Sequence, residues 1–274
     1  MMRCAVAMTP NEAKFAPIPL RGPISEVFPL AHQYGYHGIE VHMRNPGAVD
    51  WKEFAALSER HSLPITAIGT GMAARMDGLT LTDDNPDIRR RAVDCLVQYC
   101  RRLSPMESSI IIGSMNGNVG QDPDKAKQRR GYHVDCLKEC CKTAVEEGVT
   151  VLLEATNRYE CDWLNTTEDT LDVISQVNSP CLKYLADTFH MNIEEVDILS
   201  SIRRAGDRLG YVHLVDSNRE GPGRGHIPMK DVIRVLSEIG YDGILSFECL
   251  PKPDPETASV ESLKHVNSLL SEIQ

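Results

Sequence analysis

The sequence predicts a single-domain α/β protein, a (β/α)8 TIM barrel that spans residues 1–274. Short apolar runs typical of strands alternate eight times with amphipathic stretches typical of helices, which is the pattern of an α/β barrel. A chain of 274 residues suits one such barrel, since these domains have roughly 250 residues. Polar residues stand near the ends of the later strands, where a parallel barrel places its catalytic groups.

The predicted strands are short and apolar, as expected of strands that are buried on both faces. They are Arg3–Met8, Gly38–Met43, Pro64–Gly71, Ser108–Met115, Val149–Thr156, Leu182–Thr188, Gly210–Asp216 and Gly243–Cys249. An open, doubly wound sheet is the alternative, but it usually carries a glycine fingerprint after an early strand. The sequence has no such fingerprint and no linker, so a single barrel is preferred.

The predicted helices carry apolar residues at helical spacing between these strands. They are Ile24–Tyr34, Trp51–His61, Pro86–Leu103, Arg129–Glu147, Thr167–Gln176, Glu194–Ala205, Met229–Ile239 and Ser259–Ile273. Gly35, Gly148 and Gly240 follow three of them. Glycine is favoured just past a helix C-terminus because it tolerates positive φ.

Composition argues against several classes of partner. A net charge of −10 makes nucleic acid a poor partner, and no run approaches the roughly 20 apolar residues that span a bilayer. The nine cysteines include no CxxC pair, which favours reduced thiols in a cytoplasmic protein. The N-terminal MMRCAVAM has too short an apolar run for a signal sequence. A homo-oligomer, dimer or tetramer, is expected because barrels of this kind commonly assemble so.

Four residues that can bind a metal end four consecutive predicted strands. They are Glu154 in VLLEATNRYE, Asp187 in YLADTFHMN, His213 in YVHLVDSNR and Glu248 in LSFECLP. Neighbouring strands lie about 4.8 Å apart, so their ends can converge on one ion. Three carboxylates and one imidazole form a hard ligand set that suits Mn²⁺, Mg²⁺ or Co²⁺. Four independent polar residues, each satisfied by a salt bridge, are the alternative.

Further polar residues follow these strand ends. Glu160, His190 and Arg219 fall in loops at the same mouth, where they could donate to or accept from a hydroxyl-rich substrate. Each has a simpler interpretation, as a solvated ion pair or a loop histidine. Glu40 and His42 share one face of the second strand. They either line the mouth or, in the case of His42, belong to the core.

The glycine-rich segment EGPGRGHIP follows the seventh strand, at residues 220–228. Loops after strands 7 and 8 bind phosphate in many barrels, and Arg224 and His226 could do so here. A flexible lid or a turn is the alternative.

The chain resembles the xylose isomerase-like barrel superfamily in four motifs: E-x-x-N-R-Y-E, A-D-T-F-H-M-N, H-x-x-D-S-N-R with a following G-x-G-H, and S-x-E-C-L-P. Within it, the chain is most similar to the D-tagatose 3-epimerase group of ketose epimerases, and there to 5-keto-L-gluconate epimerases. The likeness includes the first half, in NP-x-x-VDW at 45–51 and LPITAIGTG at 63–71.

The resemblance implies that Glu154, Asp187, His213 and Glu248 bind one divalent metal ion. Mn²⁺ is the usual ion, with Mg²⁺, Co²⁺ or Zn²⁺ as alternatives. It also implies that Glu154 and Glu248 serve as acid and base. The implied reaction is proton transfer through a cis-enediolate on a ketose or keto-sugar acid, of the 5-keto-L-gluconate or D-tagaturonate type.

The family pattern further implies that Glu160, His190 and Arg219 contact the substrate near its carbonyl. A keto-acid would need a second basic or amide group for its carboxylate, and Arg158 and Arg224 are the candidates. An aldose–ketose isomerase, or an epimerase of a sugar phosphate, is an alternative with the same metal.

Two other functions are weaker. A phosphodiesterase resembling endonuclease IV would need histidines at the ends of the third and fourth strands, where Gly69-Thr70-Gly71 and Gly113-Ser114-Met115 stand. It would also need an acidic residue where Arg224 stands. A barrel without catalysis, used for binding or assembly, is disfavoured by the complete ligand set.

Overall fold

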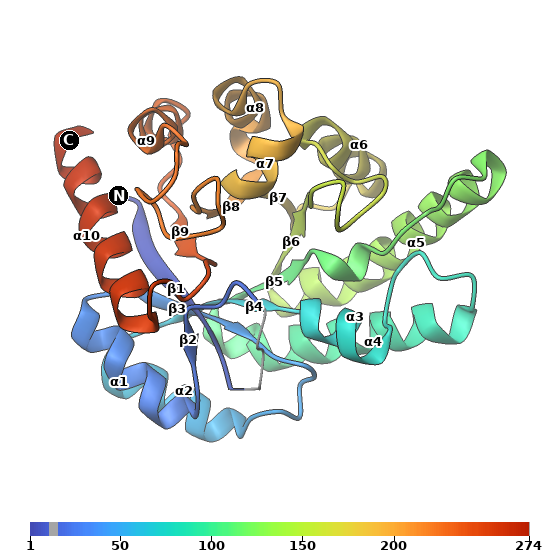
Figure 1. Ribbon diagram of the computed structural model, residues 1–274. Helices are drawn as coiled ribbons and strands as arrows, with labels where there is room; N and C mark the ends of the chain where they lie inside the picture. Colours follow the sequence, from blue (N-terminus) through green and yellow to red (C-terminus); the bar gives the residue numbers. More distant parts are fainter. Residues whose placement is uncertain (11–15, 274) are drawn as a thin grey trace.

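The computed structural model describes residues 1–10 and 16–273, which form a closed parallel β-barrel surrounded by helices (Figure 1). The barrel strands follow one another in sequence order, and β9 (Ile244–Phe247) pairs with β1 (Arg3–Thr9) to close the ring. Closure gives each of the eight barrel strands a neighbour on both sides. The predicted barrel is confirmed, and the open doubly wound sheet is excluded.

The other predicted strands are also present. Most of them are a few residues shorter than predicted, because a polar loop begins before the predicted end. The strands are β3 (Gly38–His42), β4 (Ile65–Gly69), β5 (Ser109–Ile112), β6 (Thr150–Glu154), β7 (Leu182–Asp187) and β8 (Leu209–His213). An additional strand, β2 (Leu20–Arg21), pairs in parallel with the end of β1. Two residues are too few to give a periodic signal, so β2 was not predictable.

The predicted helices cover the outside of the barrel. They are α1 (Ile24–Tyr34), α2 (Trp51–His61), α4 (Pro86–Leu103), α5 (Pro123–Glu147), α6 (Thr167–Val177), α8 (Ile198–Ala205), α9 (Met229–Glu238) and α10 (Pro255–Ile273). Gly35, Gly148 and Gly240 have φ values of 91°, 68° and 75°, as their predicted places after helices require.

Two helix starts were predicted too late. Helix α5 begins at Pro123 because the Asp122 side chain accepts hydrogen bonds from the backbone N–H groups of Asp124 and Lys125, and proline suits the first helical position. Helix α10 likewise begins at Pro255. Both starts are polar, so apolar periodicity alone did not reveal them.

The helix predicted at Glu194–Ala205 was wrong at its start. Two helices occupy this region, α7 (Thr188–Glu194) and α8, which is capped by the side chain of Asp197. The short helix α3 (Gly71–Asp77) was also not predicted.

The barrel interior places the polar residues at one end. Leu152, Leu185 and Tyr211 belong to the apolar cluster inside the barrel. Because side chains alternate along a strand, the residues two positions later face the same interior. Those residues are Glu154, Asp187 and His213, so these candidate ligands lie directly above the apolar cluster, at the C-terminal mouth of the barrel.

Two further observations concern the predicted partners and thiols. No helix within the described residues is long and apolar enough to cross a membrane. All nine cysteines are free, and eight of them are buried.

Candidate active site

The four predicted metal ligands come together at the mouth of the barrel. Glu154, Asp187, His213 and Glu248 each offer one ligand atom, and these atoms lie within 4.8 Å of one another. Asp187 and His213 are direct neighbours in the pairing of β7 with β8. Nδ1 of His213 lies 3.3 Å from Glu154 Oε1, 3.5 Å from Asp187 Oδ2 and 3.7 Å from Glu248 Oε2.

Two atoms of this cluster are buried without a hydrogen-bond partner, Oε1 of Glu154 and Nδ1 of His213. A buried polar atom without a partner is costly. Both atoms are good ligands for a hard divalent cation, and the cluster contributes two further carboxylates. The residues therefore fit a divalent metal ion at this position.

Glu40 lies behind His213 and fixes its orientation. Its side chain is fully buried and accepts hydrogen bonds from Nε2 of His213 at 3.0 Å and from Nε2 of His42 at 2.6 Å. With the Nε2 proton directed to Glu40, the Nδ1 atom of His213 faces the cluster. A metal-binding histidine usually donates its other ring N–H to a carboxylate in this way, which fixes the orientation of the ring.

The sequence left open whether Glu40 and His42 line the mouth of the barrel or whether His42 belongs to the core. Glu40 is buried beneath the mouth, whereas His42 lines the pocket and its Nε2 lies 3.6 Å from Oε1 of Glu248.

Arg219 joins two of the ligand carboxylates. Its Nη1 donates to Asp187 Oδ2 at 2.7 Å and its Nη2 donates to Oε2 of Glu248. The guanidinium also stacks on Phe189, 4.7 Å from the ring centre. Burial lowers the pKa of Arg219, but Asp187 and Glu248 outweigh burial and raise this pKa above its ordinary value.

The pKa values of Asp187 and Glu248 are shifted in opposite directions. Burial raises the pKa of Glu248 to about 7, against the opposing effect of Arg219. Burial also raises the pKa of Asp187, but Arg219 and His190 outweigh it and hold this pKa well below its usual range. Burial lowers the pKa of His213, yet Glu40 and Asp187 raise it well above 6.5.

The three predicted substrate contacts line one pocket of about 340 Å³. Glu160, His190 and Arg219 stand in its wall together with Glu154 and Glu248. The pocket thus joins two members of the four-residue cluster, Glu154 and Glu248, to the polar loops at the mouth.

His190 is held as a neutral donor. Its Nδ1 accepts from the side chain of Asn157 at 2.7 Å and from the Asn157 backbone at 3.3 Å. Its proton is therefore on Nε2. Burial lowers the pKa of His190, which keeps the ring uncharged near neutral pH. Asn157 was not predicted, although it stands within the N-R-Y-E motif.

Two glycines make room for the site. A Cβ atom at Gly113 would overlap Oε2 of Glu154, and one at Gly69 would overlap the ring of His42. These glycines occupy the ends of β5 and β4, where a three-zinc nuclease would need histidines. The space that such histidines would fill holds other side chains of this site.

The arginines predicted to meet a substrate carboxylate lie elsewhere. Arg158 pairs with Glu194, and Arg224 pairs with Glu220 and Glu261. His226 bonds to Ser217, and neither it nor Arg224 lines the pocket.

The segment 220–228 is an ordered turn. The buried carboxylate of Asp216 accepts hydrogen bonds from the backbone N–H groups of Ser217, Gly223 and Ile227. The turn interpretation of this segment therefore fits better than a phosphate loop.

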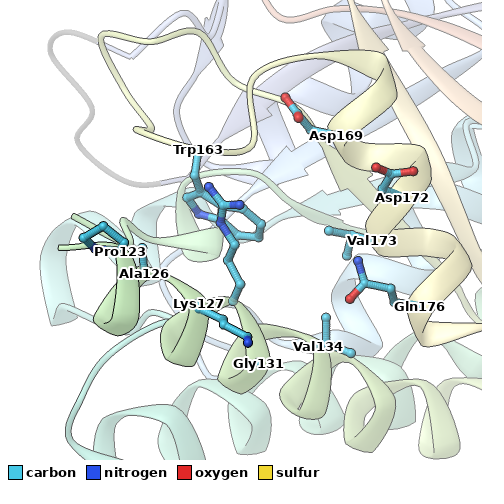
Figure 2. A pocket seen from close by; sticks show the side chains of 11 residues that line it. Pro123, Ala126, Lys127, Gly131, Val134, Trp163, Asp169, Asp172, Val173 and Gln176 are labelled. Carbon is cyan, nitrogen blue, oxygen red and sulfur yellow. The ribbon is translucent and has the colours of Figure 1, made fainter. Parts of the chain in front are cut away.

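A larger hollow lies outside the barrel. Its volume is about 610 Å³. Figure 2 shows that α5 contributes Lys127 to its lining, and that α6 contributes Asp172 and Gln176 from the other side. None of its lining residues belongs to the metal cluster. The smaller pocket is therefore the candidate active site.

Comparisons with known proteins identify the family of the chain. Residues 28–269 match the family model described as xylose isomerase-like TIM barrel. The chain belongs to this family. It is 34% identical to a D-psicose 3-epimerase of Ruminiclostridium cellulolyticum, over 72% of this chain and 67% of the relative. It is 31% identical to an L-ribulose 3-epimerase of Methylomonas sp., over 80% of this chain and 75% of the relative.

Among solved structures, D-allulose 3-epimerase from Methylomonas sp. in complex with D-allulose has a TM-score of 0.82. The identity is 22%, over 97% of this chain and 96% of that one, so this likeness speaks for the fold. The resemblance to the D-tagatose 3-epimerase group is confirmed by the relatives named as ketose epimerases. This xylose isomerase-like barrel is accordingly a carbohydrate epimerase of the isomerase class.

Proposed function

We propose that the protein is a divalent-metal-dependent epimerase that inverts a carbon next to the ketone of a keto-sugar or keto-sugar acid. The first substrates to test are 5-keto-L-gluconate and D-tagaturonate. The observation that carries the proposal is the four-residue cluster with its unpartnered Glu154 Oε1 and His213 Nδ1, because two of its members, Glu154 and Glu248, line the pocket at the mouth. We propose Mn²⁺ as the ion, with Mg²⁺, Co²⁺ and Zn²⁺ as alternatives.

Glu154 and Glu248 are proposed to move the proton. One carboxylate removes the proton from the carbon beside the ketone, and the other returns a proton to the opposite face of that carbon. Glu154 ends β6 and Glu248 follows β9, so they reach the pocket from strands separated by β7 and β8. A bound divalent cation would supply Lewis-acid stabilisation of the negative charge that builds up on the substrate oxygens.

Arg219 and His190 are proposed to hold those oxygens. Arg219 carries a fixed positive charge beside Asp187 and Glu248, and His190 presents a neutral Nε2–H donor. Preorganised donors aimed at developing negative charge are a major source of catalysis. Glu160, at the rim, is proposed to accept from a substrate hydroxyl.

The activity is tested on metal-free protein reloaded with each of the four ions. Each sample is incubated with 5-keto-L-gluconate, D-tagaturonate, D-fructose and D-tagatose, and products are resolved by chiral chromatography. We expect epimers to form with Mn²⁺ and not in the presence of a chelator. An aldose product would show the alternative isomerase, and conversion that persists without any divalent ion would refute the metal-dependent scheme.

The roles of the two glutamates are tested with Glu154→Gln and Glu248→Gln in D₂O. We expect each variant to lose epimerisation by about 10²–10⁴-fold, the usual contribution of a positioned acid or base. Because both residues are also proposed ligands, metal content is measured by elemental analysis at saturating Mn²⁺. Unchanged deuterium incorporation at the epimerised carbon in both metal-loaded variants would end the two-carboxylate scheme.

A further inference from the structure

The rim of the catalytic pocket carries an arginine that none of the roles above employs. Arg75, on helix α3, lines the catalytic pocket and also a neighbouring hollow of about 630 Å³. The two hollows share Arg75, Ser114 and Glu160, so they meet along this edge. A substrate group that extends from the metal cluster toward the rim would approach Arg75.

The contacts of Arg75 are exchangeable. Its Nη2 donates to Glu160 Oε2 at 2.7 Å, and its Nε lies 3.4 Å from Ser114 Oγ. The side chains of Arg75 and Glu160 are 59% and 35% exposed. An ion pair so exposed to water contributes little to stability. Glu160 also accepts from Asn157 at 3.3 Å, so it keeps a partner if the guanidinium turns to another anion.

The other arginines near the mouth are already engaged. Arg219 lies between Asp187 and Glu248 and pairs with both, and its side chain is 12% exposed. Arg158 makes paired hydrogen bonds to Glu194, whose side chain is only 6% exposed. The described residues that line the catalytic pocket include two with a lysine or arginine side chain, Arg75 and Arg219. Of these two described side chains, Arg75 is the one whose guanidinium is held by an exposed partner.

We propose that Arg75, assisted by the Ser114 hydroxyl, forms an anion subsite at the rim of the catalytic pocket, and that the preferred substrate carries a carboxylate or phosphate there. A guanidinium suits either group because its planar fork donates two parallel hydrogen bonds. The inference rests on the proposed epimerase function and specifies its substrate class. It also replaces Arg158 and Arg224 as the expected partners of a substrate carboxylate.

The subsite is tested with three six-carbon substrates that differ at one end: D-tagaturonate, D-tagatose 6-phosphate and D-tagatose. We expect the wild type to prefer one of the two anionic substrates, and that preference identifies the anion. In Arg75→Gln, KM for this substrate should rise about 10–100-fold, as expected for loss of a charged hydrogen bond. Its kcat and the kinetics with D-tagatose should change less than about threefold, and Arg75→Lys should be intermediate.

Arg158→Gln is the matched comparison because it removes an exposed arginine from the neighbouring loop. It should leave the ratio of anionic to neutral kcat/KM unchanged. Circular dichroism verifies that each variant is folded. A wild type that prefers D-tagatose, an unchanged ratio in Arg75→Gln, or a collapse of the ratio in Arg158→Gln would each overturn the subsite.

Failure of the proposed function can be distinguished from failure of the subsite. If no keto-sugar is converted with any metal, the epimerase proposal fails. Calorimetric binding of D-tagaturonate and D-tagatose 6-phosphate to wild type and Arg75→Gln then decides the subsite alone. Weaker binding of one anion to the variant supports the subsite, and equal binding of both overturns it.

Discussion

At the scale of single residues, the ligands were easier to predict than the residues that support them. Glu154, Asp187 and His213 interrupt apolar runs at strand ends, and a buried charge in such a run needs a partner. Glu40 interrupts a run in the same way, but its hydrogen bond to His213 joins residues 173 positions apart. No local pattern in the sequence specifies that pairing.

Arg75 was difficult to predict because the sequence around it carries no clear structural signal. It lies on α3, a helix that runs only from Gly71 to Asp77, too short for a clear apolar period. Arg158 stands inside a recognisable motif and was therefore the more visible candidate. The structure shows that Glu194 holds Arg158, and this contact again depends on tertiary structure.

Glu40→Gln tests the supporting role of Glu40. The amide is uncharged and replaces one acceptor with a donor, so it cannot accept from both His213 and His42. We expect the affinity for Mn²⁺ to fall about 10–100-fold, as is typical when the partner of a metal-binding histidine is removed. Calorimetric titration of metal-free protein measures it.

Glu261→Gln is the control for that experiment, because Glu261 is an exposed partner of Arg224 on α10. Its Mn²⁺ affinity should equal that of the wild type. A Glu40→Gln variant that binds Mn²⁺ as tightly as this control would contradict the supporting role.

At the scale of elements, strand register and glycine placement build the mouth. His213 pairs with Ser246 and with Asp187, so the ligands of β7 and β8 stand level. Glu154 pairs with Leu185, two residues before Asp187. The Glu154 side chain lies where a Cβ atom added to Gly113, at the end of β5, would be. The sequence located these strands, but it could not show that Gly113 leaves space for Glu154.

Gly113→Ala should therefore damage the site without unfolding the barrel. The new methyl group must displace the Glu154 carboxylate, because both would occupy the same space. We expect kcat/KM to fall about 100-fold, since a displacement near 1 Å can have that effect. Steady-state kinetics at saturating Mn²⁺ measures the loss.

Gly131→Ala provides a matched glycine-to-alanine change within α5, where an added Cβ meets nothing within 4 Å. It should keep full activity and raise the free energy of unfolding by about 0.5–1 kcal/mol. Equal activity of Gly113→Ala and Gly131→Ala would show that the position of Glu154 is not restricted by β5.

At the scale of the whole molecule, closure of the barrel concentrates acidic groups in one place. Glu40 comes from β3, Glu154 from β6, Asp187 from β7 and Glu248 from the segment after β9. Among the described residues, one arginine forms ion pairs with members of this acidic group, and it is Arg219. The barrel order was predictable from strand–helix alternation, and this order was enough to predict that the ligands would meet.

Such a cluster should make stability depend on metal and on pH together. Burial raises the pKa of Glu248 to about 7, from an ordinary value near 4.5. Because this pKa is higher in the folded protein than in the unfolded chain, the protonated Glu248 contributes stability that is fully present below a pH of about 4.5. That contribution is lost as the pH rises through about 7. The raised pKa of His213 acts in the same direction. The lowered pKa values of Glu40 and Asp187 matter only in more acidic solution.

We therefore expect Mn²⁺ to stabilise the protein more at pH 8 than at pH 5.5, because protons compete with the ion for Glu248 and His213. At pH 8 and 100 times its dissociation constant, a ligand adds about 2.7 kcal/mol, or roughly 5 °C in Tm for a domain of this size. Thermal unfolding with Mn²⁺ or chelator, at both pH values, measures the difference. Ca²⁺ at the same concentration controls for nonspecific screening. A Mn²⁺ shift that is equal at both pH values, or larger at pH 5.5, would show that the ion and these protons do not share a site.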